Sequence, residues 1–172
     1  MNRREFLYGT TALTIPVLAG CDNSDEPIVS IDTNYPVSPF GAKSTAEEVT
    51  LGLDLEGKTA VVTGCNSGLG YETMRVLAMR GAHVIGTGRN LEKASKACSS
   101  VSGKTTPVAL ELSEFDSIIE CSDTVTKLGY PIDILVCNAG INTFGDLELV
   151  NGVERIFAVN HLGHFILVNR LM

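Results

Sequence analysis

Three glycines, Gly64, Gly68 and Gly70, lie between a short apolar run and a stretch with helical spacing. The run at residues 59–62 has the pattern of a strand covered on both faces of a parallel sheet. A turn from such a strand into a helix leaves the first helical N–H groups unpaired and directed outward. These donors and the helix dipole favour a bound pyrophosphate. The spacing therefore predicts a dinucleotide-binding turn, with a tight turn that binds nothing as the alternative.

The end of the second expected strand carries Gly88 and Arg89. An NAD site usually has Asp or Glu there, to accept hydrogen bonds from the ribose 2′-hydroxyl. Without that carboxylate a 2′-phosphate meets no repulsion, and a guanidinium can pair with the phosphate through two N–H groups. We therefore expect NADP(H) in preference to NAD(H). The alternative is that Arg89 stacks on adenine or faces solvent, and Asn90 is expected to cap the next helix.

Strands and helices are expected to alternate from residue 59 onward, which predicts an α/β fold of the Rossmann type with a doubly wound parallel sheet. The expected strands are residues 59–63, 83–87, 107–111 and 132–138. The expected helices are residues 68–80, 91–98, 113–128 and 152–172. Ser113 with Asp116 is expected to cap the third of these helices, and Gly129 with Pro131 to end it. A capping-box pattern at residues 44–47 predicts a short helix before the first strand.

Three motifs in order resemble those of the short-chain dehydrogenases/reductases. They are Thr-Gly-x-x-x-Gly-x-Gly at residues 63–70, Cys-Asn-Ala-Gly at 137–140 and Val-Asn-His-Leu-Gly-His-Phe at 159–165. The third is similar to the retinol-dehydrogenase-like and WW-domain-oxidoreductase-like branch, and the match covers about residues 44–172. The resemblance implies hydride transfer between the cofactor and a small-molecule carbonyl or alcohol substrate. The resemblance implies eleven cofactor-binding residues, to which Arg89 is added from the argument above. They are Gly64, Asn66, Ser67, Gly68, Leu69, Gly70, Glu111, Leu112, Asn138, Ala139 and Gly140.

Two positions carry specific roles by this resemblance. Glu111, followed by Leu112, stands where the family usually has Asp and an apolar residue in contact with adenine. Asn160 is expected in mid-helix, facing inward, and the resemblance places it among the catalytic residues, where it anchors a water of the proton relay and helps to kink the helix. From the residues alone, an inward Asn is a satisfied core polar group.

The three histidines are expected to serve packing or, on the last helix, subunit contact. His161 and His164 are three residues apart and could share a helix face, but nothing else supplies metal ligands. His83, at the start of the second strand, has the same interpretation. No metal site is predicted.

The family's chemistry depends on a Ser and a Tyr-x-x-x-Lys pair beyond the last expected helix. None of the four tyrosines in this chain is followed by Lys four residues later. The last helix would leave apolar surface bare at residues 166–172, and the fourth strand would be an open edge. We therefore expect the N-terminal part of a longer reductase, with about four strands and the C-terminal half absent. A dinucleotide-binding module without turnover and a lipoprotein scaffold are the alternatives.

Residues 1–21 have the pattern of an export signal. Arg3 and Arg4 precede an apolar stretch and resemble a twin-arginine signal, and Leu18-Ala19-Gly20-Cys21 resembles a lipobox with Cys21 as the lipidated residue. Residues 22–43 are expected to be an extended tether, and residues 44–172 the dinucleotide-binding domain. We expect an exported protein anchored by lipid to the inner membrane and facing the periplasm. The alternative is a cytoplasmic protein with a fortuitous apolar start.

The composition limits the remaining function classes. The 172 residues suffice for one domain, and the interspersed charges, which sum to −7, give no indication of nucleic-acid binding. Apart from Cys21, the cysteines are Cys65, Cys98, Cys121 and Cys137, without metal-type spacing. A Cys98–Cys121 disulfide is compatible with an oxidising compartment, but structural thiols are expected. The full-length protein could form a homo-oligomer.

Overall fold

The computed structural model describes residues 38–142 and 145–172. The predicted signal at residues 1–21, Cys21 and the tether up to residue 37 lie outside these ranges. Residues Phe40–Met172 form one compact unit. In the described ranges we find no helix with both the length and the apolar character needed to span a bilayer.

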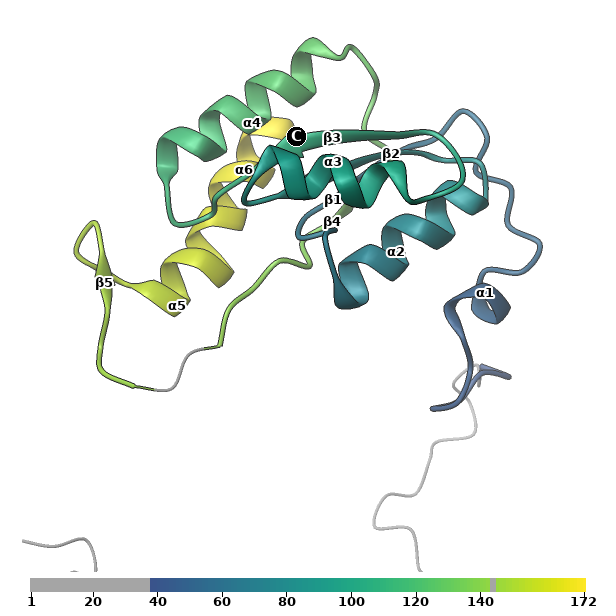
Figure 1. Cartoon of the computed structure of the whole chain (residues 1–172), viewed down its shortest axis with the longest axis horizontal. Coiled ribbons are helices and arrows are strands. Elements are labelled where there is room, and N and C mark those ends of the chain that lie inside the picture. Colours follow the sequence, from purple (N-terminus) through teal and green to yellow (C-terminus); the bar gives the residue numbers. More distant parts are fainter. Residues whose placement is uncertain (1–37, 143–144) are drawn as a thin grey trace, which may run out of the picture. The chain divides into compact units, whose positions relative to one another are not determined.

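A parallel sheet forms the centre of this unit, with the strand order β3-β2-β1-β4 (Figure 1). Its strands are β1 (Thr59–Val62), β2 (His83–Gly88), β3 (Thr105–Ala109) and β4 (Ile134–Val136). Every residue of β1 and β2 is buried, because these central strands are covered on both faces. The order runs outward from β1 in both directions, so the predicted doubly wound α/β sheet is confirmed.

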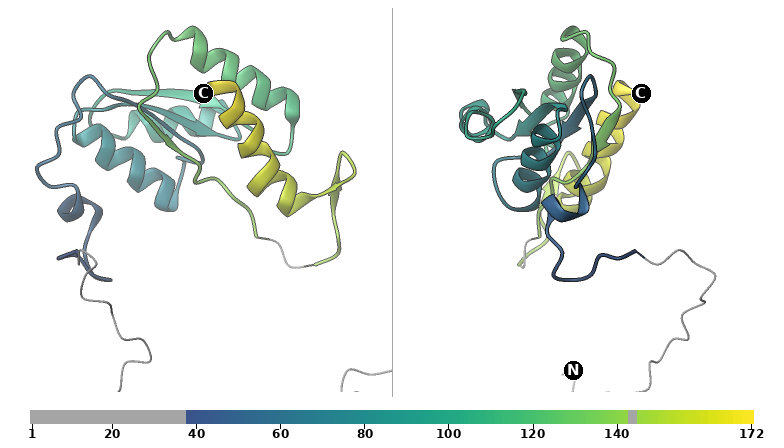
Figure 2. Two further views of the ribbon diagram at one scale, coloured as in Figure 1. Left: turned by 180° about the vertical axis from the view of Figure 1, so that it is seen from behind. Right: turned by 90° about the vertical axis from the view of Figure 1, so that its right-hand side faces the viewer.

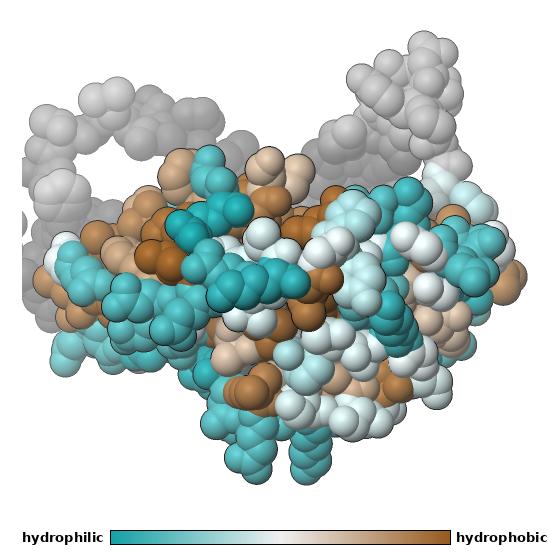
Figure 3. Space-filling model, turned by 90° about the horizontal axis from the view of Figure 1, so that it is seen from above, coloured by the Kyte–Doolittle hydropathy of each residue, from teal (hydrophilic) through white to brown (hydrophobic). Residues whose placement is uncertain are grey.

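Helices cover both faces of the sheet (Figure 2). On one face, Ala60 and Val62 of β1 pack with α2 (Gly68–Met79) and α3 (Leu91–Ser99). On the other, Val61 packs with α4 (Phe115–Lys127) and α6 (His164–Leu171). This division follows from the alternation of side chains along a strand. Hydrophilic and apolar side chains are interspersed on the surface seen from above (Figure 3), as the dispersed charges of the sequence suggest.

The two cores separate the cysteines of α3 and α4. Cys98 packs in the core beneath α2 and α3, whereas Cys121 packs in the core on the opposite face. A disulfide between them is therefore excluded by the fold. Both thiols are buried and unpaired, as structural thiols are.

The last expected helix differs from the structure at its start. A two-stranded antiparallel hairpin, β5 (Leu149–Val150) and β6 (Val153–Glu154), precedes α5 (Arg155–Phe157). Asn151 and Gly152 turn this hairpin with φ angles of 52° and 78°, the left-handed conformation that Asn-Gly pairs favour. The predicted helical start at residue 152 is therefore wrong. Between α5 and α6 the chain forms a π-helical turn, η2 (Ala158–Gly163).

The observed ends of several helices and strands differ from the predicted ends. Thr45 with Glu48, one residue later than predicted, forms the capping box of α1 (Ala46–Val49). The predicted Ser113 cap of α4 is wrong, because the Ser113 hydroxyl donates to Glu111 and α4 begins at Phe115. The Asn90 cap of α3 is confirmed, since its side chain accepts from two backbone N–H groups.

The strand β3 begins two residues earlier than predicted and ends at Ala109. Thr105 pairs with Val84 of β2, which extends the ladder at its start. At the other end, the Glu111 N–H donates to the Ser117 hydroxyl of α4, so this residue has left the sheet. Pro107 is tolerated inside β3 because this strand lies at the edge of the sheet.

Candidate functional site

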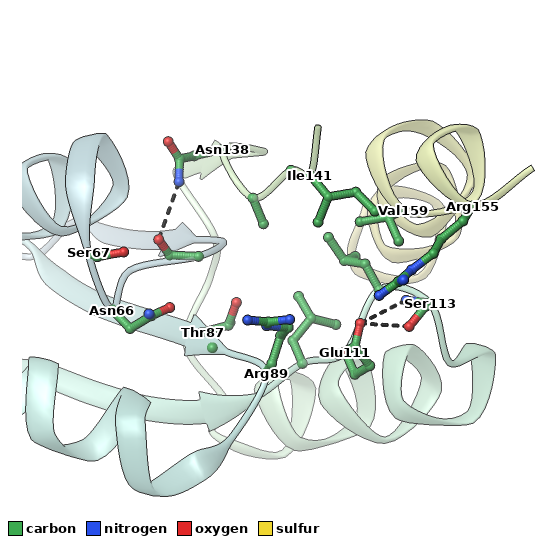
Figure 4. Close-up of a pocket in the computed structure, with 16 residues that line it drawn as sticks. Asn66, Ser67, Thr87, Arg89, Glu111, Ser113, Asn138, Ile141, Arg155 and Val159 are labelled. Carbon is green, nitrogen blue, oxygen red and sulfur yellow. Dashed lines mark hydrogen bonds between the residues drawn. The ribbon is translucent and has the colours of Figure 1, made fainter. Parts of the chain in front are cut away.

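A cavity of about 300 Å³ lies at the carboxyl ends of the parallel strands (Figure 4). In the order β3-β2-β1-β4 the direction of winding reverses between β1 and β4, and ligands of such sheets bind at that crevice. All predicted cofactor-binding residues line the cavity except Gly68, Leu69 and Gly70. Its full lining is Gly64, Asn66, Ser67, Thr87, Gly88, Arg89, Leu110, Glu111, Leu112, Ser113, Asn138, Ala139, Gly140, Ile141, Arg155 and Val159.

The glycine loop and the start of α2 contain positions that suit only glycine. Gly64 has φ of +71°, in the left-handed region. A Cβ at Gly70 would lie 2.3 Å from the Gly64 carbonyl oxygen and 2.3 Å from the side-chain nitrogen of Asn138. Ser67 is the N-cap of α2, and its side chain makes no capping bond in the described structure. The first N–H groups of this twelve-residue helix therefore lack the usual side-chain acceptor.

Thr63 ties this loop to the turn that follows β4. Its hydroxyl oxygen accepts hydrogen bonds from the backbone N–H groups of Asn138 and Ala139, both at 2.9 Å. The Asn138 side chain donates in turn to the Thr63 carbonyl at 2.8 Å. A weaker contact from the same amide to the Gly64 carbonyl is drawn in Figure 4. The two walls of the cavity, the glycine loop and the Asn-Ala-Gly turn, are thus joined directly.

The same hydroxyl lies 2.9 Å from Nε2 of His164, which is buried. The oxygen already accepts two N–H donors, so the hydroxyl hydrogen can go to the Val136 carbonyl at 3.4 Å or to Nε2 at 2.9 Å, and the shorter contact favours Nε2. Nε2 is then unprotonated, and the proton on Nδ1 points to the Asn160 carbonyl at 3.3 Å. Burial lowers the pKa of His164, which favours this neutral ring, although the bond to the Asn160 carbonyl opposes the shift.

Two of the three histidines, His83 and His164, are buried and make contacts within the fold, whereas His161 is exposed. His164 joins the last helix to β1 through Thr63, and Nε2 of His83 lies 2.8 Å from the Thr106 hydroxyl. His161 is exposed and stacks on Phe157, with ring centroids 5.0 Å apart. Within residues 38–142 and 145–172 no group of three potential metal ligands among His, Cys, Asp and Glu comes together.

Asn160 differs from expectation in its direction. It is exposed rather than inward-facing, and it does not line the cavity. Its side-chain oxygen accepts from the N–H of Ile141 and its side-chain nitrogen donates to the carbonyl of the same residue, both at 2.8 Å. The π-helical turn shifts the register of residues 158–163, and periodicity of 3.6 residues no longer applies there. Asn160 therefore fixes the segment after the Asn-Ala-Gly turn.

The end of β2 places two polar side chains at the cavity. The Thr87 hydroxyl is fully buried and has no hydrogen-bond partner within the described part of the chain. Arg89 is exposed, and Figure 4 shows its side chain between Thr87 and Glu111. A buried hydroxyl without a partner costs free energy unless a ligand or water satisfies it. This end of the cavity thus suits a polar ligand, and no carboxylate follows β2 directly.

The remaining polar side chains come from the end of β3 and from α5. The Glu111 carboxylate accepts from the N–H and hydroxyl of Ser113 at 3.1 and 2.8 Å, so it is oriented by its own turn. Arg155 points into the cavity in Figure 4 and pairs with Glu148. Sequence reasoning did not assign Arg155, Thr87, Ile141 or Val159 to the site. The Asn151-Gly152 pair is a signal for the hairpin before Arg155, but it does not indicate that Arg155 lines the cavity.

The fold and the cavity define a nucleotide-binding domain of the Rossmann type. The short-chain dehydrogenase family model matches residues 58–172. The chain therefore belongs to the short-chain dehydrogenase family, as its three motifs suggested.

Curated relatives agree with this assignment. The WW domain-containing oxidoreductase of Pongo abelii is 39% identical over 137 residues, which cover 77% of this chain and 33% of the relative. The chloroplastic short-chain dehydrogenase TIC 32 A of Brassica napus is 39% identical over 141 residues, 78% of this chain and 44% of the relative. The human retinol dehydrogenase 13 is 37% identical over 123 residues, which cover 69% of this chain and 37% of the relative. The match thus spans less than half the length of each of these relatives.

Solved structures show the same fold. An uncharacterised protein from Mycobacterium Paratuberculosis has a TM-score of 0.63 at 38% identity, covering 69% of this chain and 43% of that one. A metagenomic short-chain oxidoreductase in complex with NADP has a TM-score of 0.61 at 30% identity, covering 67% and 55%.

Proposed function

We propose that this chain forms the NADP(H)-binding part of an oxidoreductase that interconverts a carbonyl and an alcohol. The observation that carries this proposal is the cavity at the switch point of the sheet, where Arg89 follows β2 without an adjacent carboxylate. NADP(H), when bound, supplies or accepts the hydride. The NADP complex of the metagenomic relative supports the choice of cofactor.

The residues present fit a dinucleotide in three places. The uncapped start of α2 offers N–H donors to a pyrophosphate, and Gly64 and Gly70 keep side chains out of its approach. The unpartnered Thr87 hydroxyl and the Arg89 guanidinium would hold the ribose and its 2′-phosphate. The turn that begins at Asn138 would form the opposite wall, held by Thr63.

The substrate of the full-length protein would be a small-molecule carbonyl or alcohol, by family. Asn160 would act from outside the cavity, by fixing the backbone of Ile141 and orienting a water of the proton relay. A second proposal concerns the 172 residues alone: they bind the dinucleotide without turnover. It is supported by the tyrosines, none of which has Lys four residues later.

Titration with NADPH and NADH tests the cofactor proposal. Arg89→Asp removes a charge-assisted pair worth roughly 1.5–3 kcal/mol, so the NADPH dissociation constant should rise about 10- to 150-fold while that of NADH changes little. Lys43→Asp makes the same charge change at an exposed residue away from the cavity and should leave both constants unchanged. The cofactor proposal would be overturned if Arg89→Asp reduced the affinities for NADPH and NADH equally, or if the parent protein showed no saturable binding.

The export of the protein is a separate proposal. We infer that residues 1–21 direct export and that Cys21 carries a lipid anchoring the protein at the inner membrane. The paired arginines and the residues before Cys21 support this proposal.

A further inference from the structure

Three sulfur atoms meet over Gly86, in the interior of β2. A Cβ at Gly86 would lie 2.7 Å from Sγ of Cys65, 2.8 Å from Sδ of Met74 and 3.0 Å from Sγ of Cys98. The three side chains come from the glycine loop, α2 and α3, and their exposed fractions are 0%, 0% and 3%. Glycine leaves open the space that any other residue of β2 would fill with its own side chain. The sulfurs therefore converge on one point from three segments.

Hydrogen bonds show that the sulfurs face one another. The Cys98 thiol lies 3.7 Å from Sδ of Met74, within reach of a hydrogen bond. The Cys65 and Cys98 thiols hydrogen-bond with each other as well. The three sulfur atoms are thus close neighbours in this part of the core.

The spacing and chemistry of this cluster match a low-coordinate site for a soft metal ion. Three ligands with bonds of about 2.3 Å in a trigonal plane lie about 4.0 Å from one another, close to the separation of Cys98 and Met74. Thiolate and thioether ligands select Cu(I) over cations that prefer nitrogen or oxygen. We propose that Cys65, Cys98 and Met74 form a binding site for a soft monovalent cation, Cu(I), beneath the glycine loop.

Binding at this site is a ligand exchange without redox change. The Cys65 and Cys98 sulfurs each donate an electron pair to Cu(I) and release any proton they hold, while the Met74 thioether donates a pair and loses nothing. A second cavity, of about 410 Å³, is lined by Asn66 and Ala97, the sequence neighbours of the two cysteines. The segments that carry both cysteines therefore border a second cavity. The proposal is independent of which dinucleotide the loop binds.

The test uses the 172-residue protein with Cys21→Ser and Cys137→Ser, which remove the thiol outside the described ranges and the exposed thiol. Cu(I) is titrated without oxygen against a chromophoric chelator, and X-ray absorption counts the sulfur neighbours. We expect one Cu(I) per chain with three sulfurs. Met74→Leu keeps the core volume, and it should reduce the sulfur count to two and weaken binding about tenfold or more.

Two cysteine variants test whether the thiols of this cluster bind the cation. Cys98→Ala should abolish stoichiometric binding, with circular dichroism showing that the protein is folded. Cys121→Ser changes a buried thiol on the opposite face of the sheet and should leave the affinity unchanged. Unchanged binding in Cys98→Ala, the same sulfur count in Met74→Leu, or copper bound only by nitrogen and oxygen would overturn the proposal.

Discussion

Replacing Thr63 with valine tests whether one hydroxyl joins the two walls of the cavity. Valine has nearly the shape of threonine, so the packing around this fully buried residue is retained. The change removes the acceptor of the Asn138 and Ala139 N–H groups and the donor to Nε2 of His164. Three polar groups would then lose a partner at once.

The expected cost follows from these contacts. A buried polar group left without a partner costs about 1–3 kcal/mol. The Ala139 N–H lies in a half-buried turn and falls at the lower end, while the Asn138 N–H keeps the Val136 carbonyl as an acceptor at 3.1 Å. Together with the lost bond to His164, Thr63→Val should lower the free energy of unfolding by about 2–4 kcal/mol. This is a large share of the roughly 5–15 kcal/mol that stabilises a typical domain.

Urea unfolding measures the effect as a fall in the midpoint at an unchanged slope. Thr63→Ser is the matched control, because it keeps the hydroxyl and loses only a methyl group, at about 1 kcal/mol. The valine variant should therefore be clearly less stable than the serine variant. If Thr63→Val is as stable as Thr63→Ser, the hydroxyl does not hold the turn and the reasoning fails. In the valine variant, NMR should also show the pKa of His164 rising, because the bond that favours its neutral form is gone.

Other predictions address the loop, the histidines and the anchor. Gly70→Ala places a methyl 2.3 Å from the Gly64 carbonyl oxygen, so it should cost about 1–3 kcal/mol in urea unfolding and abolish NADPH binding by titration. Burial lowers the pKa of both His83 and His164 from 6.5, so the unfolded chain binds protons below that pH that the folded chain does not. The urea midpoint should accordingly fall as the pH drops below 6.5, and it should fall less steeply in His164→Gln. Cys21→Ser should move the protein from the membrane to the soluble fraction, and retention on membranes would count against the lipid anchor.

The sheet could be predicted because its signals are local. The residues of β1 and β2 form apolar runs bounded by glycine, and a buried parallel strand needs little else. The hairpin before α5 was missed because its strands have only two residues each, too few to show an alternating pattern. Asn151-Gly152 was the one local sign of it.

Some residues of the candidate site could also be predicted from the sequence, and others could not. The glycine loop and Arg89 follow their strands directly, so position in the sequence suffices to place them at the cavity. Arg155 lies at the start of α5, after the β5–β6 hairpin, and nothing near it in sequence indicates that it lines the cavity. Asn160 was predicted to face inward because the periodicity assumed an α-helix, and the π-helical turn changes the direction of that side chain. Periodicity predicts direction only where the helix is regular.

The contacts of Thr63 and Asn160 explain why three distant motifs occur together in this chain. Thr63, in the first motif, binds the backbone of the second and the His164 ring of the third. Asn160, in the third, binds the backbone of Ile141 just after the second, while its carbonyl faces Nδ1 of His164. None of Thr63, Asn160 and His164 lines the cavity, yet together they fix its glycine loop against its opposite wall. The third motif therefore contributes to this site by positioning, and the π-helical turn allows one asparagine to meet both partners.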